Sequence, residues 1–391
     1  MEAAVCEPWD LQPGLAYLNH GSFGATPRVL LEQQAALRRE MEADPVGFLW
    51  RSLPGRIDPA RAALAEFLDC DPGGLVFVPN ATHAVNAVLG SIDWREGDRI
   101  VTTDHGYNAC HAAVERVAAR HRLDHHVVPL PWPVPPGADL AAPVLDACNE
   151  RTRLVILDHV TSPTAIRLPV GRIVSELRAK GVDTLIDGAH APGMIDCRPD
   201  EIGATWYTGN LHKWVCAPKG AAFFQTAVDW RERTFPCSTS HGWNTPMDGR
   251  SRYQAMFDWT GTVDPSAWLC VPETLRFIAS LDPRGWDGVR DRNHRAVVEA
   301  RRFLMERLNL DAPCDESLLG SMATLRMPGG GVGRSAVEWR NLLRDDFSIE
   351  VQTLERDGAV WFRISRQLYN GMEDYERLAG ALRRITCPPA R

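Results

Sequence analysis

The chain has 391 residues, of which 45% are hydrophobic and 24% charged, and its formal net charge is -7. This composition is that of an ordinary globular protein, long enough for two domains or for one large domain with a smaller appendage. An acidic balance gives no electrostatic footprint for nucleic acid, and no apolar run is long enough to cross a bilayer. We therefore expect neither nucleic acid nor membranes as partners.

The ten cysteines are scattered, with no Cys-x-x-Cys pair among them. This spacing argues against a zinc ribbon, a redox dithiol or a disulfide framework. The first six residues lack the positive start and apolar core of a signal peptide. We expect a cytoplasmic protein whose cysteines are mostly small buried hydrophobes.

From about residue 60 to 225, short strand-like runs alternate with longer amphipathic stretches. Such alternation predicts crossover connections and a mostly parallel sheet that is covered on both faces. Ligands of such sheets bind at the carboxyl ends of the strands. We predict strands at 75–78, 99–102, 126–130, 153–158, 182–186 and 220–224, and helices at 84–89, 107–120 and 170–180.

Beyond about residue 270, longer helices are predicted at 288–308 and 372–384, and shorter strands at 322–327 and 361–365. This change of pattern indicates a second, smaller α+β domain. We predict a large domain over residues 15–265 and a small domain built from residues 1–14 and 266–391.

Only three of the 43 basic residues are lysines, and one of them, Lys213, lies in the run 208–214. A lysine can hold an aldehyde cofactor as an imine and then act as a base, which arginine cannot do because it stays protonated. An ordinary surface lysine is the alternative, but it leaves unexplained why this position kept a lysine. We infer that Lys213 is kept for covalent chemistry.

Two further segments suit a phosphorylated pyridine cofactor. The run 185–190 is an apolar strand that ends in Asp187, and an ionised aspartate there can pair with a protonated ring nitrogen. The run 80–83 follows a strand and opens a helix, so its N–H groups and the Thr82 hydroxyl can receive a phosphate. Taken alone, each is more often a turn or a helix cap.

The segment 104–108 follows the strand at 99–102 and offers two flat side chains, His105 and Tyr107. Either ring can lie on a cofactor ring, and either alone is more often a packed loop residue. The sequence leaves the choice between them open.

Taken together, these segments resemble the class V aminotransferase family of fold-type I pyridoxal-phosphate enzymes in order and spacing. The resemblance rests on residues 80–83, 104–108, 187–190 and 208–214, and similarity to the isopenicillin N epimerase-like branch on residues 17–24, 158–164 and 363–365. It implies an α/β fold-type I PLP-dependent transferase fold with a mostly parallel seven-stranded sheet and a smaller C-terminal α+β domain. It also implies pyridoxal 5'-phosphate as cofactor and a homodimer with its active site at the subunit interface.

By position, the resemblance makes Lys213 the imine lysine, Asp187 the pyridinium partner and His190 a neighbour of the phenolic oxygen or ring; these are the implied catalytic residues. Thr262 resembles a phosphate contact borrowed from the partner subunit, and Ser162 stands where many relatives carry an asparagine. The implied cofactor-binding set is Ala81, Thr82, His83, His105, Tyr107, Ser162, Asp187, His190, Asn210, His212, Lys213 and Thr262.

Arg363 resembles the arginine that clamps the substrate carboxylate as a bidentate fork, with a structural salt bridge as the alternative. Epimerisation needs a second base that faces Lys213, and the candidates are His241, His20 and Tyr107. The implied substrate-binding residues are Arg363, Asn19, His20 and His241.

Several reactions start from removal of the α-proton of an amino acid bound as an imine. Reprotonation on the opposite face gives an epimerase, reprotonation at the cofactor carbon gives transamination, and loss of a β-thiolate gives a carbon-sulfur lyase. Decarboxylation coupled to oxidative deamination of an S-conjugated cysteine is known among lincosamide-pathway relatives. A persulfide-forming desulfurase is disfavoured. Desulfurases of the family need a nucleophilic cysteine shortly before the arginine that Arg363 resembles, and residues 351–361 contain no cysteine.

We favour β-elimination from an S-substituted L-cysteine conjugate, in bacterial secondary or thiol metabolism, with an epimerase of the isopenicillin N type as the alternative. The resemblance supports this choice, and stacking surfaces for a bulky S-substituent are available at Trp214, Trp243, Trp259 and Trp268.

A histidine metal site is a hypothesis of a different class. His121, His125 and His126 lie close together, but no carboxylate or cysteine completes a ligand set. The glycine-rich run 329–333 resembles a phosphate loop only superficially. A cofactor-binding module without catalysis would not need Arg363, so we predict an enzyme without a bound metal.

Overall fold

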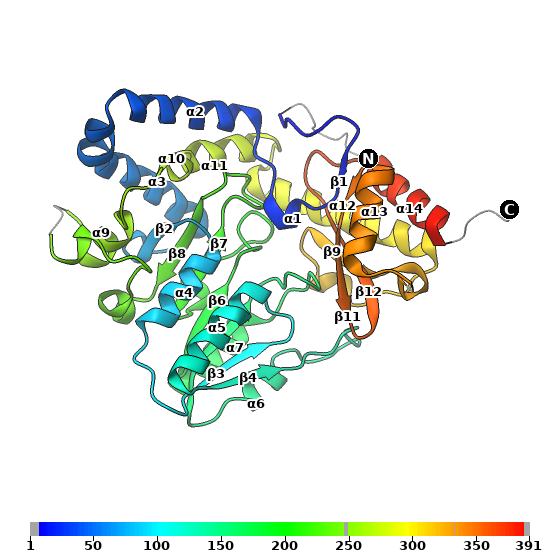
Figure 1. Cartoon of the computed structure of the whole chain (residues 1–391), viewed down its shortest axis with the longest axis horizontal. Coiled ribbons are helices and arrows are strands. Elements are labelled where there is room, and N and C mark those ends of the chain that lie inside the picture. Colours follow the sequence, from blue (N-terminus) through cyan, green and yellow to red (C-terminus); the bar gives the residue numbers. More distant parts are fainter. Residues whose placement is uncertain (1–7, 246–248, 332, 387–391) are drawn as a thin grey trace.

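The computed structural model describes residues 8–245, 249–331 and 333–386. A seven-stranded sheet of order β2-β8-β7-β6-β5-β3-β4 forms the centre of the larger lobe (Figure 1). Only β8 runs antiparallel to its neighbours, which confirms the predicted mostly parallel sheet. The strands are β2 (Leu75–Val78), β3 (Arg99–Thr103), β4 (Asp124–Val128), β5 (Thr152–Asp158), β6 (Asp183–Asp187), β7 (Trp206–Asn210) and β8 (Ala222–Thr226).

Side chains of alternating strand residues pack on opposite faces of this sheet, as the two-residue period of a strand requires. The helices that contribute to the two faces are α3 (Leu53–Leu68), α4 (Ala81–Ser91), α5 (Asn108–His121) and α7 (Val170–Ala179). Along β5, Leu154 and Ile156 share a core with α4 and α5, whereas Val155 and Leu157 share the other core with α3 and α7. The sheet is therefore covered on both sides, as predicted.

Two features of the sheet differ from the sequence prediction. The strand predicted at 126–130 is β4 at Asp124–Val128, because the prolines from Pro129 onward lack the N–H donors that a strand ladder needs. The strand β7 was not predicted, because Thr208-Gly209-Asn210 is typical of a loop. It lies fully buried between β6 and β8.

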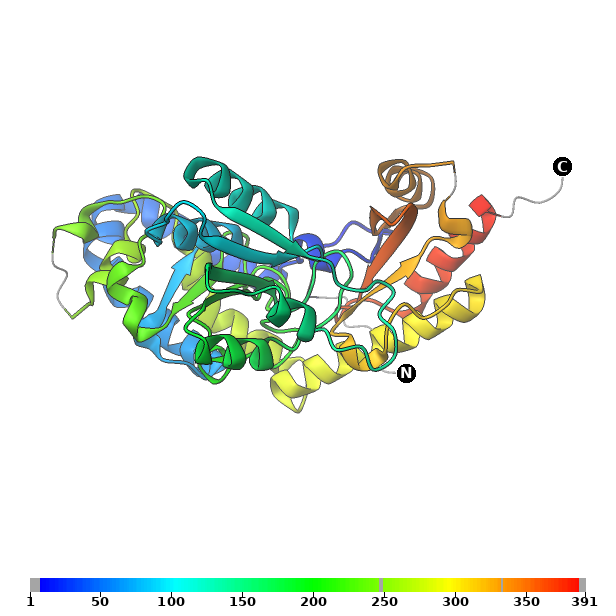
Figure 2. The same cartoon turned by 90° about the horizontal axis from the view of Figure 1, so that it is seen from below.

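The smaller lobe holds a three-stranded antiparallel sheet of order β11-β12-β9, seen apart from the larger lobe in Figure 2. Helix α12 packs on β9 and α14, and α13 packs on β11. The predicted helices at 288–308 and 372–384 are confirmed as α12 and α14. These elements are β9 (Met322–Arg326), β11 (Gln352–Arg356), β12 (Ala359–Ser365), α12 (Gly285–Leu308), α13 (Ala336–Phe347) and α14 (Met372–Thr386).

The N-terminal segment connects the two lobes. Its strand β1 (Ala16–Tyr17) pairs with β10 (Ile349–Glu350) of the smaller lobe, and the chain then turns through α1 (His20–Phe23) toward the larger sheet. This path brings α1 to the carboxyl ends of the central strands (Figure 1). The first seven residues lie outside the described part of the chain.

The remaining helices are mostly short. They are α2 (Arg28–Ala43), a π-helix η1 (Gly47–Ser52), α6 (Ala142–Asp146), α8 (Pro199–Ile202), α9 (Arg252–Asp258), α10 (Ser266–Leu269) and α11 (Val271–Ser280), with 3-10 turns at Pro72–Gly74, Val228–Arg233, His241–Trp243, Glu316–Leu318 and Pro328–Gly331. Helices α10 and α11 pack against α3 of the larger lobe. The domain boundary at residue 265 stays a prediction.

Within the described ranges, no group of three or more histidine, cysteine, aspartate or glutamate side chains is arranged to hold a metal ion. His121 ends α5 and His125 lies on β4, so the two do not share a helix face. The eight described cysteines are free thiols; Cys6, Cys387 and Val332 lie outside the described residues. None of the described helices combines the length and apolarity needed to span a membrane.

Candidate functional site

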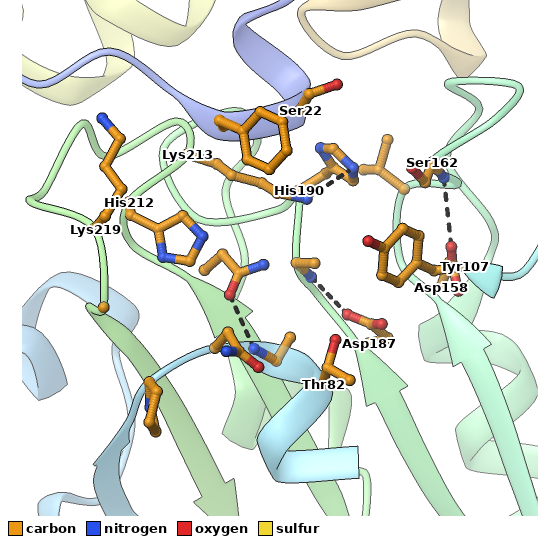
Figure 3. A pocket seen from close by; sticks show the side chains of 18 residues that line it. Ser22, Thr82, Tyr107, Asp158, Ser162, Asp187, His190, His212, Lys213 and Lys219 are labelled. Atoms are coloured by element: carbon orange, nitrogen blue, oxygen red, sulfur yellow. Dashed lines mark hydrogen bonds between the residues drawn. The ribbon is translucent and has the colours of Figure 1, made fainter. Parts of the chain in front are cut away.

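A cavity of about 500 Å³ lies at the carboxyl ends of the central strands (Figure 3). Its wall is made by loops that follow β2, β3, β5, β6 and β7, together with α1. The fold thus brings together segments that are up to about 200 residues apart in sequence. The predicted site residues that line it are Ala81, Thr82, Tyr107, Ser162, Asp187, His190, Asn210, His212 and Lys213.

Lys213 follows β7, and its Nζ lies 3.2 Å from Nε2 of His190. Burial lowers the pKa of Lys213 from 10.5 to about 8, and the nearby Asp187 carboxylate opposes this shift only in part. A lysine in this state has a substantial neutral fraction near physiological pH. Its amine can therefore act as a nucleophile toward an aldehyde and as a base toward a carbon acid.

Asp187 ends β6 at the floor of the cavity. Its Oδ1 accepts the N–H of Ala189 at 2.9 Å, and its Oδ2 accepts the thiol proton of Cys110 at 3.3 Å. Two donors thus orient the carboxylate. The residue is buried, with 3% of its surface exposed. It can place a negative charge beside a ring nitrogen in the cavity.

The opposite end of the cavity is the N-terminus of α4. Asn80 caps this helix by accepting the His83 N–H at 2.9 Å, and Oδ1 of Asn210 accepts the N–H of Ala81 at 2.9 Å. The positive end of the helix dipole and the Thr82 hydroxyl then face the cavity. Amine, carboxylate and helix terminus are spaced along one cavity, and this donor set fits a phosphorylated pyridine aldehyde.

Arg363, on β12, is buried behind the cavity wall. Its guanidinium donates to the Ser162 carbonyl, to Ser22 Oγ at 3.2 Å and to Asn19 Oδ1 at 3.4 Å. Within the described residues, no carboxylate lies within 4.0 Å of it, so the alternative of a structural salt bridge is not observed. Ser22 and Ser162 line the cavity and separate Arg363 from it.

Comparison with known proteins identifies the family of the chain. A family model described as Aminotransferase class-V matches residues 52–305. The chain belongs to this family. Isopenicillin N epimerase of Streptomyces clavuligerus is 34% identical over 388 residues, which cover 96% of each chain. The putative L-cysteine desulfhydrase 1 of Oryza sativa subsp. japonica is 33% identical over 412 residues, covering 96% of this chain and 84% of the relative.

Among solved structures, the cystine C-S lyase C-DES, in complex with its product cysteine persulfide, has a TM-score of 0.80 and 21% identity and covers 95% of this chain and 97% of its own. The predicted family, branch and fold class are confirmed. Class V aminotransferases use pyridoxal phosphate, so the predicted cofactor and the prediction of an enzyme are confirmed at the level of the family.

The structure places Tyr107, and not His105, at the cavity of this class V enzyme. Tyr107 lines the cavity and is 45% exposed. His105 is fully buried, shares a hydrogen bond of 2.7 Å with Thr164 Oγ1 and lies edge-on to Trp132. Of the two rings between which the sequence left the choice open, the structure therefore favours Tyr107, because the His105 ring packs against Trp132 instead.

Other predicted contacts also lie outside the cavity of the single chain. His83 contributes its backbone N–H to the cap of α4, while its side chain does not line the cavity. Asn19 supports Arg363 from behind. Thr262 is exposed between α9 and α10, so its contact with a partner subunit's cofactor stays a prediction.

Two candidates for a second base do not face Lys213. His20 is fully buried and bonds the Lys213 carbonyl at 2.9 Å and the Tyr369 hydroxyl at 2.7 Å, so it supports the lysine loop. His241 is exposed, with its ring edge-on to Trp50 at 6.3 Å. Neither side chain lines the cavity of the single chain, and the role of either as a second base stays a prediction.

The four tryptophans proposed as stacking surfaces do not line the cavity either. Trp214 and Trp268 are buried, and Trp243 stacks on the Arg252 guanidinium at 3.9 Å. The aromatic lining comes instead from Tyr107 and from Phe23, which is 71% exposed.

Two ionisable residues of the cavity were missed by sequence reasoning. Asp158 ends β5 directly beside Asp187, and burial together with that neighbour raises its pKa well above the ordinary value. Lys219 lines the cavity and donates to Thr26 Oγ1 at 3.1 Å. The scarcity of lysine that singled out Lys213 applies equally to Lys219, and would have found it.

Proposed function

We propose that this enzyme cleaves the carbon-sulfur bond of an S-substituted L-cysteine by β-elimination, with pyridoxal 5'-phosphate as cofactor. The observation that carries the proposal is the set of bases in the cavity: the Lys213 amine lies beside His190, whereas the second amine, Lys219, is bonded to Thr26. Of the candidates for a second base, only Tyr107 lines the cavity, and its ring is also the one available to cover the cofactor. Elimination needs one base, whereas epimerisation by two bases needs another on the opposite face.

Bound pyridoxal phosphate supplies an electron sink for negative charge at the α-carbon. Lys213 takes the α-proton with its neutral amine and holds it as an ammonium. Asp187 keeps the ring nitrogen charged, and the N-terminus of α4 with Thr82 and Asn210 holds the phosphate. The α-carboxylate takes the place of the Ser22 hydroxyl as a partner of Arg363, so that the substrate presents its α-proton to Lys213.

The leaving group departs when the Cβ–S bond breaks and the sulfur keeps the electron pair. The proton held by Lys213 then neutralises the thiolate, and hydrolysis of the remaining three-carbon unit gives pyruvate and ammonium. The relative of Oryza sativa named as an L-cysteine desulfhydrase supports a lyase of this kind. Secondary or thiol metabolism is the setting in which S-substituted cysteines occur as substrates.

Epimerisation is the second candidate, because isopenicillin N epimerase of Streptomyces clavuligerus is 34% identical along almost the whole chain. Tyr107 would then be the second proton carrier. Decarboxylation coupled to oxidative deamination is a third outcome of the same site.

One product analysis separates these reactions. The purified enzyme is incubated with S-substituted L-cysteines, with Lys213→Ala as the inactive control. Pyruvate and a thiol in equal amounts support the proposal. Retention of the carbon-sulfur bond with a D-configured α-carbon identifies an epimerase instead, and carbon dioxide with an aldehyde identifies the decarboxylating reaction.

We also propose that the active unit is a homodimer in which Thr262 reaches the partner subunit's cofactor phosphate. Its exposure on the segment between α9 and α10 supports this proposal. Light scattering gives the oligomeric state. A monomer with full cofactor affinity would overturn the proposal, as would a Thr262→Ala enzyme that binds the cofactor unchanged.

A further inference from the structure

Three side chains form a hydrogen-bonded row that ends at the amine of Lys213. The Trp214 Nε1–H donates to His190 Nδ1 over 3.3 Å, and His190 Nε2 lies 3.2 Å from Lys213 Nζ. Trp214 and His190 are 1% and 2% exposed, so water hardly competes for these bonds. Figure 3 shows His190 and Lys213 joined in this way at the cavity.

The row determines where the histidine proton lies. An indole N–H is a donor only, so Nδ1 of His190 must offer its lone pair. A neutral imidazole carries one ring proton, which is then on Nε2 and points at Lys213 Nζ. An ammonium has no lone pair to accept this proton, so the row favours Lys213 as a neutral amine.

We propose that Trp214 is a positioning residue: it fixes His190 in the Nε2–H tautomer, so that His190 donates toward Lys213 and toward any group bound there. His190 is thereby prevented from taking a proton from Lys213. The inference rests on the proposed function only in placing the cofactor at Lys213. It adds a residue that contacts neither substrate nor cofactor.

The charges around the row agree with this arrangement. Burial, and then the neighbouring basic groups Lys213, Arg363, His20 and His212, hold the pKa of His190 well below its ordinary value, so the ring is neutral. Lys213 faces the carboxylates of Asp187 and Asp158 and the thiol of Cys110, which raise its pKa, but burial outweighs them and leaves it at about 8. These neighbouring groups lie on β5, β6, α5, α1 and β12 and in the loop after β7.

The decisive measurement is nitrogen NMR of the full-length enzyme labelled with ¹⁵N-histidine, with and without pyridoxal phosphate and in the absence of substrate. His190→Gln identifies the His190 signals. In the wild type we expect Nδ1 in the unprotonated range and Nε2 in the protonated range at neutral pH. In Trp214→Phe, which keeps the packing but lacks the donor, both signals should move toward those of mixed tautomers.

Trp339→Phe is the matched control. Trp339 is also 1% exposed, and its Nε1–H donates to the Gly331 carbonyl at 3.2 Å, in the smaller lobe. Its substitution should leave the His190 signals unchanged. A change of equal size in both variants would assign the effect to general loosening and would overturn the inference.

A second measurement follows Lys213 itself. In Trp214→Phe the lone pair of Nε2 becomes available to a protonated Lys213 nitrogen, so the pH midpoint of the visible absorbance of bound pyridoxal phosphate should rise by roughly one unit, with no change in Trp339→Phe. A proton on Nδ1 of His190 in the wild type would overturn the inference. It would also be overturned if the nitrogen signals of His190 and the pH midpoint of the absorbance were the same in Trp214→Phe as in the wild type. If Trp214→Phe does not fold, the wild-type nitrogen spectrum still decides the tautomer of His190. If the enzyme does not cleave carbon-sulfur bonds, the inference about Trp214 and His190 is unaffected, because the spectrum is recorded without substrate.

Discussion

Arg363 is a buried cation whose hydrogen-bond partners are all neutral. Its partners are the Ser162 carbonyl, the Ser22 hydroxyl and the Asn19 amide oxygen, and burial lowers its pKa to about 10. A buried cation without a carboxylate costs folding free energy. We infer that the charge is kept for an anion that arrives later, the substrate carboxylate.

We expect Arg363→Met to leave the free energy of unfolding of the apoenzyme unchanged or to raise it by about 1 kcal/mol, because an uncompensated charge is removed. The KM for an S-substituted cysteine should rise about 10- to 100-fold, since hydrogen bonds to charged groups contribute roughly 1.5–3 kcal/mol. Urea unfolding and steady-state kinetics measure the two effects.

Arg61 provides the control for this prediction, because it is also buried but pairs with Asp258 at 2.6 Å. Asp258 pairs with Arg250 as well, so Arg61→Met removes one of two buried partners of this carboxylate and should lower the free energy of unfolding by about 3 kcal/mol. An equal loss in Arg363→Met would show that Arg363 is a structural residue.

The charge of Lys213 makes the stability of the apoenzyme depend on pH. Its pKa is about 8 in the folded chain and 10.5 in the unfolded chain. Between these values the unfolded state binds more protons, so the free energy of unfolding rises with pH, by up to about 3 kcal/mol. Lys213→Met should lack this rise. Urea unfolding at pH 7.5 and pH 10 tests it, and an identical pH response in both proteins would refute the assigned pKa.

At the scale of elements, the cavity depends on where strands end and helices begin. Most strands of the central sheet are readable from apolar runs, because both of their faces are buried. The exception is β7, whose Gly209 is needed because a Cβ there would lie 2.6 Å from the Phe223 ring. In the local sequence this glycine indicates a loop. Only the packing of β7 against β8 explains why a strand has a glycine at this position.

We expect Asn80→Ala to lower the free energy of unfolding by about 1 kcal/mol, the usual cost of losing an N-cap. It should also weaken the binding of pyridoxal phosphate, because the cap positions the N-terminus of α4 at the phosphate. Ser335→Ala removes the cap of α13, where Ser335 and Glu338 form a capping box, and should cost similar stability. Fluorescence titration with the cofactor distinguishes the two; equal cofactor affinity in both variants would contradict this role of α4.

At the scale of the whole molecule, the N-terminal segment links the smaller lobe to the lysine loop. Gly24 has φ 49°, and a Cβ at this position would lie 2.1 Å from the His212 carbonyl oxygen. His20, four residues earlier, bonds the Lys213 carbonyl. The position of Lys213 therefore depends on a segment that is nearly 190 residues away in sequence.

We expect Gly24→Ala to displace the lysine loop and to lower cofactor affinity at least about 10-fold, with a loss of stability beyond the backbone strain. Gly14→Ala is the control, since Gly14 also has a positive φ, 77°, but has nothing within 4 Å of an added Cβ. Cofactor titration and thermal unfolding of both variants measure the difference. Similar behaviour of the two would show that only backbone strain matters at Gly24.

The sequence by itself determined the alternating α/β fold through its local periodicity, and the family with its cofactor class through the resemblance of its motifs. It also singled out Lys213, because few chemistries need a lysine where arginine is otherwise used. It also predicted that Asp187, Thr82 and Asn210 lie at the same site, because the strands of one parallel sheet end at one edge.

Only the tertiary structure decided which flat ring reaches the cavity, that His20 supports the lysine loop from behind, and that Asp158 and Lys219 line the site. It also showed Arg363 without a carboxylate partner. The physical reason is that side-chain direction and burial depend on loops packed from distant parts of the chain, such as the segment with Trp132 over His105. Local sequence carries no record of these contacts.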